Sequence, residues 1–298
     1  MILLHGTHSL ISVLALPLLL AGVQQFAAAD DTTAASGKPG RILFVTQSFG
    51  YKHSVVDRKS HPLSMAEQEV TDWGASSNLY HVDCTQDVAK DLTKDNLQNY
   101  DIVMFYTTGP RAKWPVDDAT LDYLCTDWVK QRGHGFIGVH AGADTLEDYQ
   151  PYWEMLGGTF NGHPWNANEK VTVTVHDQNH PLSKPWGPEF EITDEIYRFK
   201  NWQPEKVRVL MSLNMAKTRL KQPYQVPIAW VKNYGDGKVL HMSLGHREDV
   251  WTNEKYTQSL LGGVKWLMGL EPGDATPNPD VSSAQEAKAK DDFEAAQK

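Results

Sequence analysis

Cysteine is scarce in this chain: its 298 residues contain only Cys84 and Cys125. Two cysteines cannot build the disulfide framework of a small secreted fold, so a hydrophobic core must hold this one together. Cys84 ends a predicted strand and Cys125 lies in a predicted helix. We expect each to be a buried free thiol, although an exported chain could pair them.

Local signatures of several function classes are also missing. There is no H-E-x-x-H, no H-x-H and no closely spaced cysteine pair, which are the usual marks of a zinc site. There is no glycine-rich dinucleotide fingerprint or P-loop, so redox and phosphoryl-transfer roles have no local support. The net charge of −9 argues against a nucleic-acid partner, since proteins that bind nucleic acid present basic patches.

The first 29 residues lack Lys, Arg, Asp and Glu altogether. An apolar core at 10–23 is followed by Ala27-Ala28-Ala29, which fits the cleavage rule of a signal peptide. We therefore predict a signal peptide cut after Ala29, a periplasmic or secreted location and a flexible leader at 30–40. An uncleaved membrane anchor is the alternative. No other stretch is apolar enough to span a bilayer.

Buried strands alternate with amphipathic helices in the first half of the remaining chain. Apolar runs typical of strands cover 41–46, 78–82, 101–106 and 135–139, and helical spacing covers 63–73 and 116–131. Strands that are apolar throughout favour a parallel sheet covered on both faces. The predicted fold class is therefore α/β with a doubly wound, mostly parallel sheet, in which sites form beyond the carboxyl ends of the strands.

After Glu169 the pattern becomes that of antiparallel strands. Strands are predicted at 171–175, 207–213, 228–234 and 238–244, the last two joined by a hairpin turn at 235–237, and a helix at 256–268. We expect one domain over 41–270. The charged, alanine-rich tail at 271–298 is predicted to be disordered or a frayed helix.

The fourth strand runs into Gly-Val-His-Ala-Gly at 138–142, the outline of a nucleophile elbow with His140 in the central position. The glycines let the chain turn sharply, so the central side chain projects at the mouth of the sheet. An imidazole there is suited to general acid–base catalysis or to metal ligation. Asp144, close to the first turn of a helix expected to begin near Ala143, either stabilises that helix or orients an imidazole.

Other histidines are predicted at the same edge of the sheet. His53 lies on the loop after the first strand, and His246 lies just past the end of the last strand. His163 precedes a proline, which keeps it extended. Trp165 beside it offers a flat face to a sugar ring, although a core tryptophan is the more common case. Any of these loop histidines could instead be a solvated residue.

A polar pair interrupts the aromatic stretch at 194–199. Glu195 is a candidate acid or base, Asp194 could be a turn residue that accepts backbone hydrogen bonds, and Tyr197 is a candidate substrate-binding residue. A metal site, for example for zinc, remains open as an alternative. Its candidate ligands are His53, His140, His163 and His246.

Taken in order, these segments resemble the ThuA, or trehalose-utilisation, family. The matching pieces lie at 50–53, 138–144, 156–164, 194–199, 227–251 and 261–266, and together they span nearly all of 41–270. The resemblance implies a class I glutamine amidotransferase-like fold, related to the flavodoxin-like sheet. It also implies a setting in sugar catabolism that includes disaccharides oxidised to 3-keto forms. Because His140 replaces the nucleophilic cysteine of true amidotransferases, glutamine hydrolysis through a thioester is not expected.

Three functions therefore stay open. The first is an enzyme that acts on a sugar or 3-keto-sugar by acid–base chemistry. Its expected catalytic residues are His140, His246, His53, Glu195 and Asp144, and its expected substrate-binding residues are His163, Trp165 and Tyr197. The second is a metal-dependent hydrolase or isomerase. The third is a carbohydrate-binding or accessory protein without turnover. In each case the expected partner is a small carbohydrate.

Overall fold

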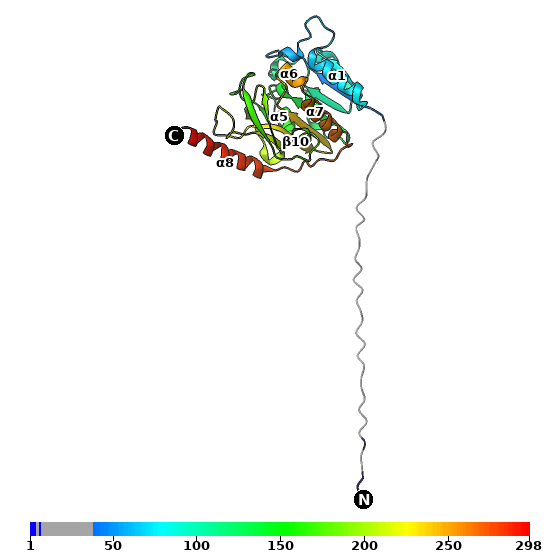
Figure 1. The fold of residues 1–298 in the computed structure, drawn as a ribbon. Helices are drawn as coiled ribbons and strands as arrows, with labels where there is room; N and C mark the ends of the chain where they lie inside the picture. Colours follow the sequence, from blue (N-terminus) through cyan, green and yellow to red (C-terminus); the bar gives the residue numbers. More distant parts are fainter. Residues whose placement is uncertain (4–5, 7–37) are drawn as a thin grey trace. The chain divides into compact units, whose positions relative to one another are not determined.

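The computed structural model describes residues 1–3, 6 and 38–298 (Figure 1). The predicted signal peptide and leader lie almost entirely outside the described residues. The chain divides into two units, 1–34 and 35–298, and every helix and strand described belongs to the second. Among the described residues, no helix has the length and apolar character needed to cross a membrane.

A nine-stranded mixed sheet forms the centre of the second unit, in the order β2-β1-β3-β4-β11-β10-β9-β6-β7. The strands are β1 Gly40–Val45, β2 Tyr80–Thr85, β3 Ile102–Phe105, β4 Gly135–Val139, β6 Lys170–Val175, β7 Glu189–Thr193, β9 Arg208–Leu213, β10 Pro227–Tyr234 and β11 Gly237–Met242. Neighbours from β2 to β11 pair in parallel, and those from β11 to β7 pair antiparallel. A separate antiparallel pair is formed by β5 Thr159–Phe160 and β8 Phe199–Lys200.

Side chains of the parallel strands point alternately into two cores. In β1, Ile42 and Phe44 enter one core while Leu43 and Val45 enter the other. Four of the described α-helices contribute to the first core: α1 Met65–Ser77, α6 Glu248–Trp251, α7 Glu254–Leu267 and, through Ala289, α8 Pro279–Ala296. Four contribute to the second: α2 Val88–Asp91, α3 Lys94–Leu97, α4 Asp118–Asp122 and α5 Gln150–Leu156. The sheet is therefore covered on both faces, as the apolar strands predict.

Local sequence fixes the ends of the main helices. Ser64 and Glu67 form a capping box at the start of α1, and α1 ends at Asn78, whose φ of 54° is left-handed. The side chain of Asn253 accepts the backbone N–H of Lys255 at the start of α7. These caps place α1 and α7 where their apolar stripes meet the sheet.

The helix predicted to begin near Ala143 is absent from this part of the described chain. His140–Ala143 forms a single 3-10 turn that ends at Asp144, and α5 begins only at Gln150. Leu146 has a φ of 48°, which no helix can continue through. Asp144 therefore follows a tight turn instead of lying in the first turn of a long helix.

The tail forms a helix, α8 Pro279–Ala296, which is the helical one of the two alternatives predicted for this segment. Alanine favours helix, and α8 packs against β9 (red in Figure 1). Ser282 and Ala289 are buried, and Glu286 accepts the backbone N–H of Gln225 at 2.7 Å. Tertiary contacts thus order a segment whose many charged residues favour exposure to solvent.

Both cysteines are free thiols, as predicted. Cys125 is buried in the π-helical turn Tyr123–Trp128, and Cys84 is half-buried at the end of β2. Burial is the main reason that the pKa of Cys84 rises to about 12, and the charge of Glu67 adds to it. A thiol with such a pKa is unreactive at neutral pH, which leaves both cysteines structural.

Candidate functional site

Three histidines meet beyond the carboxyl ends of the parallel strands. His53 follows β1, His140 follows β4 and His246 lies past the end of β11. Because these strands are parallel, their carboxyl ends share one edge of the sheet. The ring centroids of His53 lie 5.0 Å from His140 and 4.9 Å from His246, and those of His140 and His246 are 5.3 Å apart. The structure thus brings together residues that are almost 200 positions apart in the chain.

His140 occupies a tight elbow. Its φ of 41° is unusual for a residue with a Cβ, and a Cβ on Gly142 would lie 2.8 Å from the carbonyl oxygen of Phe105. Nδ1 of His140 lies 2.8 Å from the carbonyl oxygen of Ser243. Because a carbonyl only accepts, Nδ1 carries a hydrogen and donates it to Ser243. This hydrogen bond fixes the ring, whose other nitrogen, Nε2, faces Glu195.

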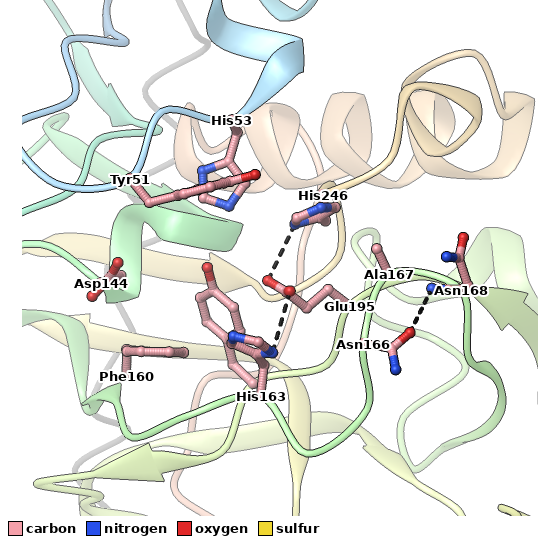
Figure 2. A pocket seen from close by; sticks show the side chains of 11 residues that line it. Tyr51, His53, Asp144, Phe160, His163, Asn166, Ala167, Asn168, Glu195 and His246 are labelled. Carbon is pink, nitrogen blue, oxygen red and sulfur yellow. Dashed lines mark hydrogen bonds and ion pairs between the residues drawn. The ribbon is translucent and has the colours of Figure 1, made fainter.

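Glu195 reaches the histidines through a local strand pairing. The β5–β8 pair continues into a bridge in which the N–H of Ile196 donates to the carbonyl of Trp165 at 2.9 Å. Oε2 of Glu195 lies 3.1 Å from Nδ1 of His246 and 3.5 Å from Nε2 of His140. Its other oxygen, Oε1, lies 3.4 Å from Nδ1 of His163 (Figure 2). One carboxylate therefore contacts three histidines.

Electrostatic interactions within the cluster keep the carboxylate of Glu195 charged and the imidazole of His53 neutral. Burial raises the pKa of Glu195, but the hydrogen-bonding and charge of His140 and His246 outweigh it and leave that pKa below its ordinary value. Burial, helped by the charges of His140 and His246, lowers the pKa of His53 to about 2. Nδ1 of His53 is buried and has no hydrogen-bond partner among the described residues, whereas Nε2 of His140 and Nδ1 of His246 face the carboxylate of Glu195. An unpaired buried nitrogen is rare in folded proteins and indicates a missing partner.

Asp194 fixes the loop that carries His246. Its carboxylate accepts the backbone N–H groups of Gly245 at 2.7 Å and Arg247 at 3.1 Å. Burial raises the pKa of Asp194, although the charge of His140 and these two bonds oppose the change. Asp194 thus accepts backbone hydrogen bonds, which is one of the roles considered for it. Because the two bonds are made to the residues before and after His246, they hold His246 in position.

Replacing Asp194 with alanine is expected to destabilise the fold by about 3 kcal/mol. Two hydrogen bonds to a charged group are lost, each worth about 1.5–3 kcal/mol, and two N–H groups are left without an acceptor. Urea unfolding of Asp194→Ala measures the change. Asp249→Ala is the control, because Asp249 is exposed and its ion pair with the side chain of Arg247 is worth about 0–1 kcal/mol. Equal losses in both variants would contradict the positioning role.

A cavity of about 590 Å³ opens over the cluster. Its lining residues are Tyr51, His53, Asp144, Phe160, His163, Asn166, Ala167, Asn168, Glu195, Tyr197 and His246. The aromatic rings of Tyr51, Phe160 and Tyr197 line this cavity, and so do the titratable side chains of His53, Asp144, His163, Glu195 and His246. A few polar groups converging in a largely apolar pocket are typical of small-molecule sites.

Trp165 is not part of this cavity, so its predicted role in stacking on a sugar is wrong. Its side chain is fully buried in the core, and Nε1 donates to the carbonyl of Leu220 at 3.2 Å. Position 165 lies just past His163, but the backbone turns the indole inward. Phe160 and Tyr51 provide the aromatic surface instead, and nothing in their local sequence marks them as pocket residues.

Asp144 lies on the cavity wall away from the Glu195–His246 contact (Figure 2). Its carboxylate forms no hydrogen bond or ion pair with the residues that the structure describes. Burial raises the pKa of Asp144 to about 7, with further increases from Glu147 and Glu195 and a decrease from Lys200. A carboxyl group that titrates near neutrality in a cavity is a frequent mark of a functional site.

Residues 41–267 match the sequence model of a known protein family, ThuA, whose description is trehalose utilisation. The chain belongs to the ThuA family. No curated protein matches it. A ThuA-like protein from Bacteroides uniformis is 19% identical with a TM-score of 0.60, covering 83% of this chain and 97% of its own. One from Parabacteroides merdae is 14% identical with a TM-score of 0.59, covering 82% and 99%.

A third structure, a cytoplasmic protein from Salmonella typhimurium LT2, is 12% identical with a TM-score of 0.53 and covers 76% of this chain and 99% of its own. At these identities the likeness shows the fold alone. The predicted family and the predicted α/β fold class are both confirmed. In this ThuA-family chain, His140 occupies the elbow and both cysteines lie outside the cavity lining.

Proposed function

We propose that this ThuA-family protein is an enzyme that acts on a sugar or 3-keto-sugar by proton transfer in the cavity beside His140. The observation that supports it most is the unpartnered carboxylate of Asp144 facing the same cavity as the Glu195–histidine cluster. The apolar faces of Tyr51, Phe160 and Tyr197 suit the C–H face of a sugar ring. The proposal includes export, because the first 29 residues carry no charged side chain and end in three alanines.

In this proposal Asp144 is the base. A keto group acidifies the C–H bond on the neighbouring carbon, and Asp144 takes that proton. The electron pair of the broken C–H bond forms a C=C bond, and the keto oxygen becomes an enolate oxygen facing the cluster. Return of the proton to the opposite face of the same carbon gives an epimer. Its return to the former keto carbon, with the hydroxyl proton of the neighbouring carbon moving to the enolate oxygen, gives an isomer. Loss of a neighbouring C–O bond, with protonation of the departing oxygen, gives elimination.

Replacing Asp144 with asparagine is expected to lower kcat on keto-sugars by about 10²–10⁴-fold, because asparagine cannot accept the proton. In the wild type, activity is expected to rise as pH increases through about 7, since the base must be ionised and the pKa of Asp144 is about 7. The charged groups facing it are Glu147, Glu195 and Lys200, with Tyr197 also near. Asp144→Asn should lack this limb of the pH profile.

The same substitution is expected to raise the unfolding temperature at pH 8. The raised pKa means that the folded state holds the proton more tightly than the unfolded chain, so stability falls as pH rises from about 4 to 7. Asparagine does not ionise, so the variant does not lose this stability as pH rises. Asp148→Asn is the control, because Asp148 is an exposed residue whose side chain accepts the N–H of Arg111, a role that asparagine keeps. Unchanged activity and an unchanged pH profile in Asp144→Asn would contradict the assignment, and tight sugar binding without any turnover would favour an accessory protein.

A further inference from the structure

We propose that His53, His140, His246 and Glu195 bind one divalent transition-metal ion of the zinc class. The inference rests on the proposed function only for the role of the ion, since binding itself can be measured without substrate. One ligand atom from each of the four residues lies within 4.8 Å of the others. Three of the four residues are buried, and His246 is half-buried. Four potential ligands from four different loops thus meet at one point.

Two of the spacings among these atoms match those of a metal site. A ligand distance of about 2.1 Å in a tetrahedral site separates neighbouring ligand atoms by about 3.4 Å. Oε2 of Glu195 lies 3.1 Å from Nδ1 of His246 and 3.5 Å from Nε2 of His140. These two contacts fall on either side of the expected separation.

The charges and lone pairs within the cluster also favour a bound metal ion. Nδ1 of His140 donates to Ser243, and Nε2 of the same ring lies 3.5 Å from a carboxylate oxygen of Glu195. A positive group, either a proton or a metal ion, is needed between two such electron-rich atoms. Nδ1 of His53 is buried and has no hydrogen-bond partner among the described residues. One shared proton would satisfy a single pair of these atoms, whereas a metal ion would satisfy all four residues.

The surroundings resemble the outer shell of a metal site. Metal-ligating histidines usually donate their second nitrogen to a carbonyl or carboxylate, which fixes the ring, and His140 does so to Ser243. Asp194 holds the loop of His246 through two backbone N–H groups. Neither feature requires a metal, but together they orient two of the proposed ligands.

The ligand set selects the class of ion. Three imidazoles and one carboxylate suit zinc, cobalt, iron or manganese, while calcium and magnesium prefer oxygen ligands. His163, one of the four histidines predicted to bind metal, is replaced in this set by Glu195. It contacts the other carboxylate oxygen, Oε1, and half of its side chain is exposed.

When bound, the ion would act as a Lewis acid toward a substrate oxygen. A nitrogen lone pair that binds an ion cannot also take a proton. Proton transfer would therefore fall to Asp144, which lies outside the ligand set. This division of roles narrows the proposed function to one base and one electrophilic centre.

The test uses the full chain, purified without a histidine tag and stripped with a chelator. Zn²⁺ alone and, separately, Co²⁺ alone are titrated by calorimetry, and the visible absorption of bound Co²⁺ reports its coordination. We expect one equivalent per chain and a loss of affinity of about 100-fold or more in His246→Ala. His81→Ala is the matched control, because His81 is an exposed histidine on β2, and it should bind like the wild type.

Circular dichroism checks that His246→Ala is folded, and Glu195→Gln provides a second variant with the same expected loss. Less than one-tenth of an equivalent bound to the wild type would overturn the inference, as would unchanged affinity in folded His246→Ala and Glu195→Gln. Turnover that depends on Asp144 in metal-free protein would also overturn the metal's role while leaving the proposed function intact. One equivalent bound without any turnover would support the site and contradict the proposed function.

Discussion

The His140→Ala variant is expected to turn over keto-sugars at least about 10³-fold more slowly than the wild type. The substitution removes Nε2, a proposed metal ligand that lies 3.5 Å from Glu195, and removing one electrostatic group of a site costs about 10²–10³ in kcat. The loss should be larger here, since the same nitrogen belongs to a cluster that acts as a unit. Values of kcat/KM over a panel of keto-disaccharides measure the effect.

Folding of this variant needs its own check. Alanine keeps a Cβ at the φ of 41°, so the backbone strain at position 140 is unchanged, but the carbonyl of Ser243 loses its donor. We expect a loss of about 1 kcal/mol in unfolding free energy. His81→Ala again serves as the control for removal of a histidine. Full activity in a folded His140→Ala protein would show that the elbow is not the centre of the site.

Glu195→Gln is expected to lower turnover by about 10²-fold or more and to weaken metal binding by a similar factor. Glutamine has nearly the same shape, but it lacks the negative charge, and its N–H₂ group donates hydrogen bonds and does not bind a metal ion. The contacts at 3.1 Å to His246, 3.4 Å to His163 and 3.5 Å to His140 all change together. Steady-state kinetics and calorimetry on one preparation report both effects.

Glu191→Gln is the matched control for this substitution. Glu191 lies on β7, four residues before Glu195, and forms an exposed ion pair with Lys170. Such a pair contributes about 0–1 kcal/mol, so activity and metal binding should stay within twofold of the wild type. If Glu195→Gln behaved like Glu191→Gln, the carboxylate would have no role in binding or catalysis.

The sequence predicts much of the sheet edge because the relevant signals are local. Each of His53, His140 and His246 follows an apolar strand, and parallel strands end at a common edge. The glycines around His140 likewise predict a sharp turn from residue types alone. For these residues, order along the chain was enough to place them together.

Other parts of the site depend on contacts between distant segments. Glu195 meets His163 because β5 pairs with β8, and each of these strands has only two residues. Such short runs have no periodicity that distinguishes them from loops. The same pairing directs the side chain of Trp165 into the core, whereas a side chain one position away would face the cavity.

The fold of the tail follows the same rule. The charge pattern of α8 is compatible with solvent exposure, and its order depends on contacts with β9 and on the bond from Gln225 to Glu286. Helix α5 starts late because Leu146 takes a left-handed φ that its residue type does not favour. Tertiary packing overrides local preference in both segments.

An anomalous difference map from crystals of the full chain soaked in Zn²⁺ would test the central claim most directly. We predict one strong peak within about 2.0–2.2 Å of Nε2 of His140 and of a carboxylate oxygen of Glu195, with His53 and His246 completing the site. Peaks confined to exposed histidines such as His81, with none inside the cluster, would contradict the account.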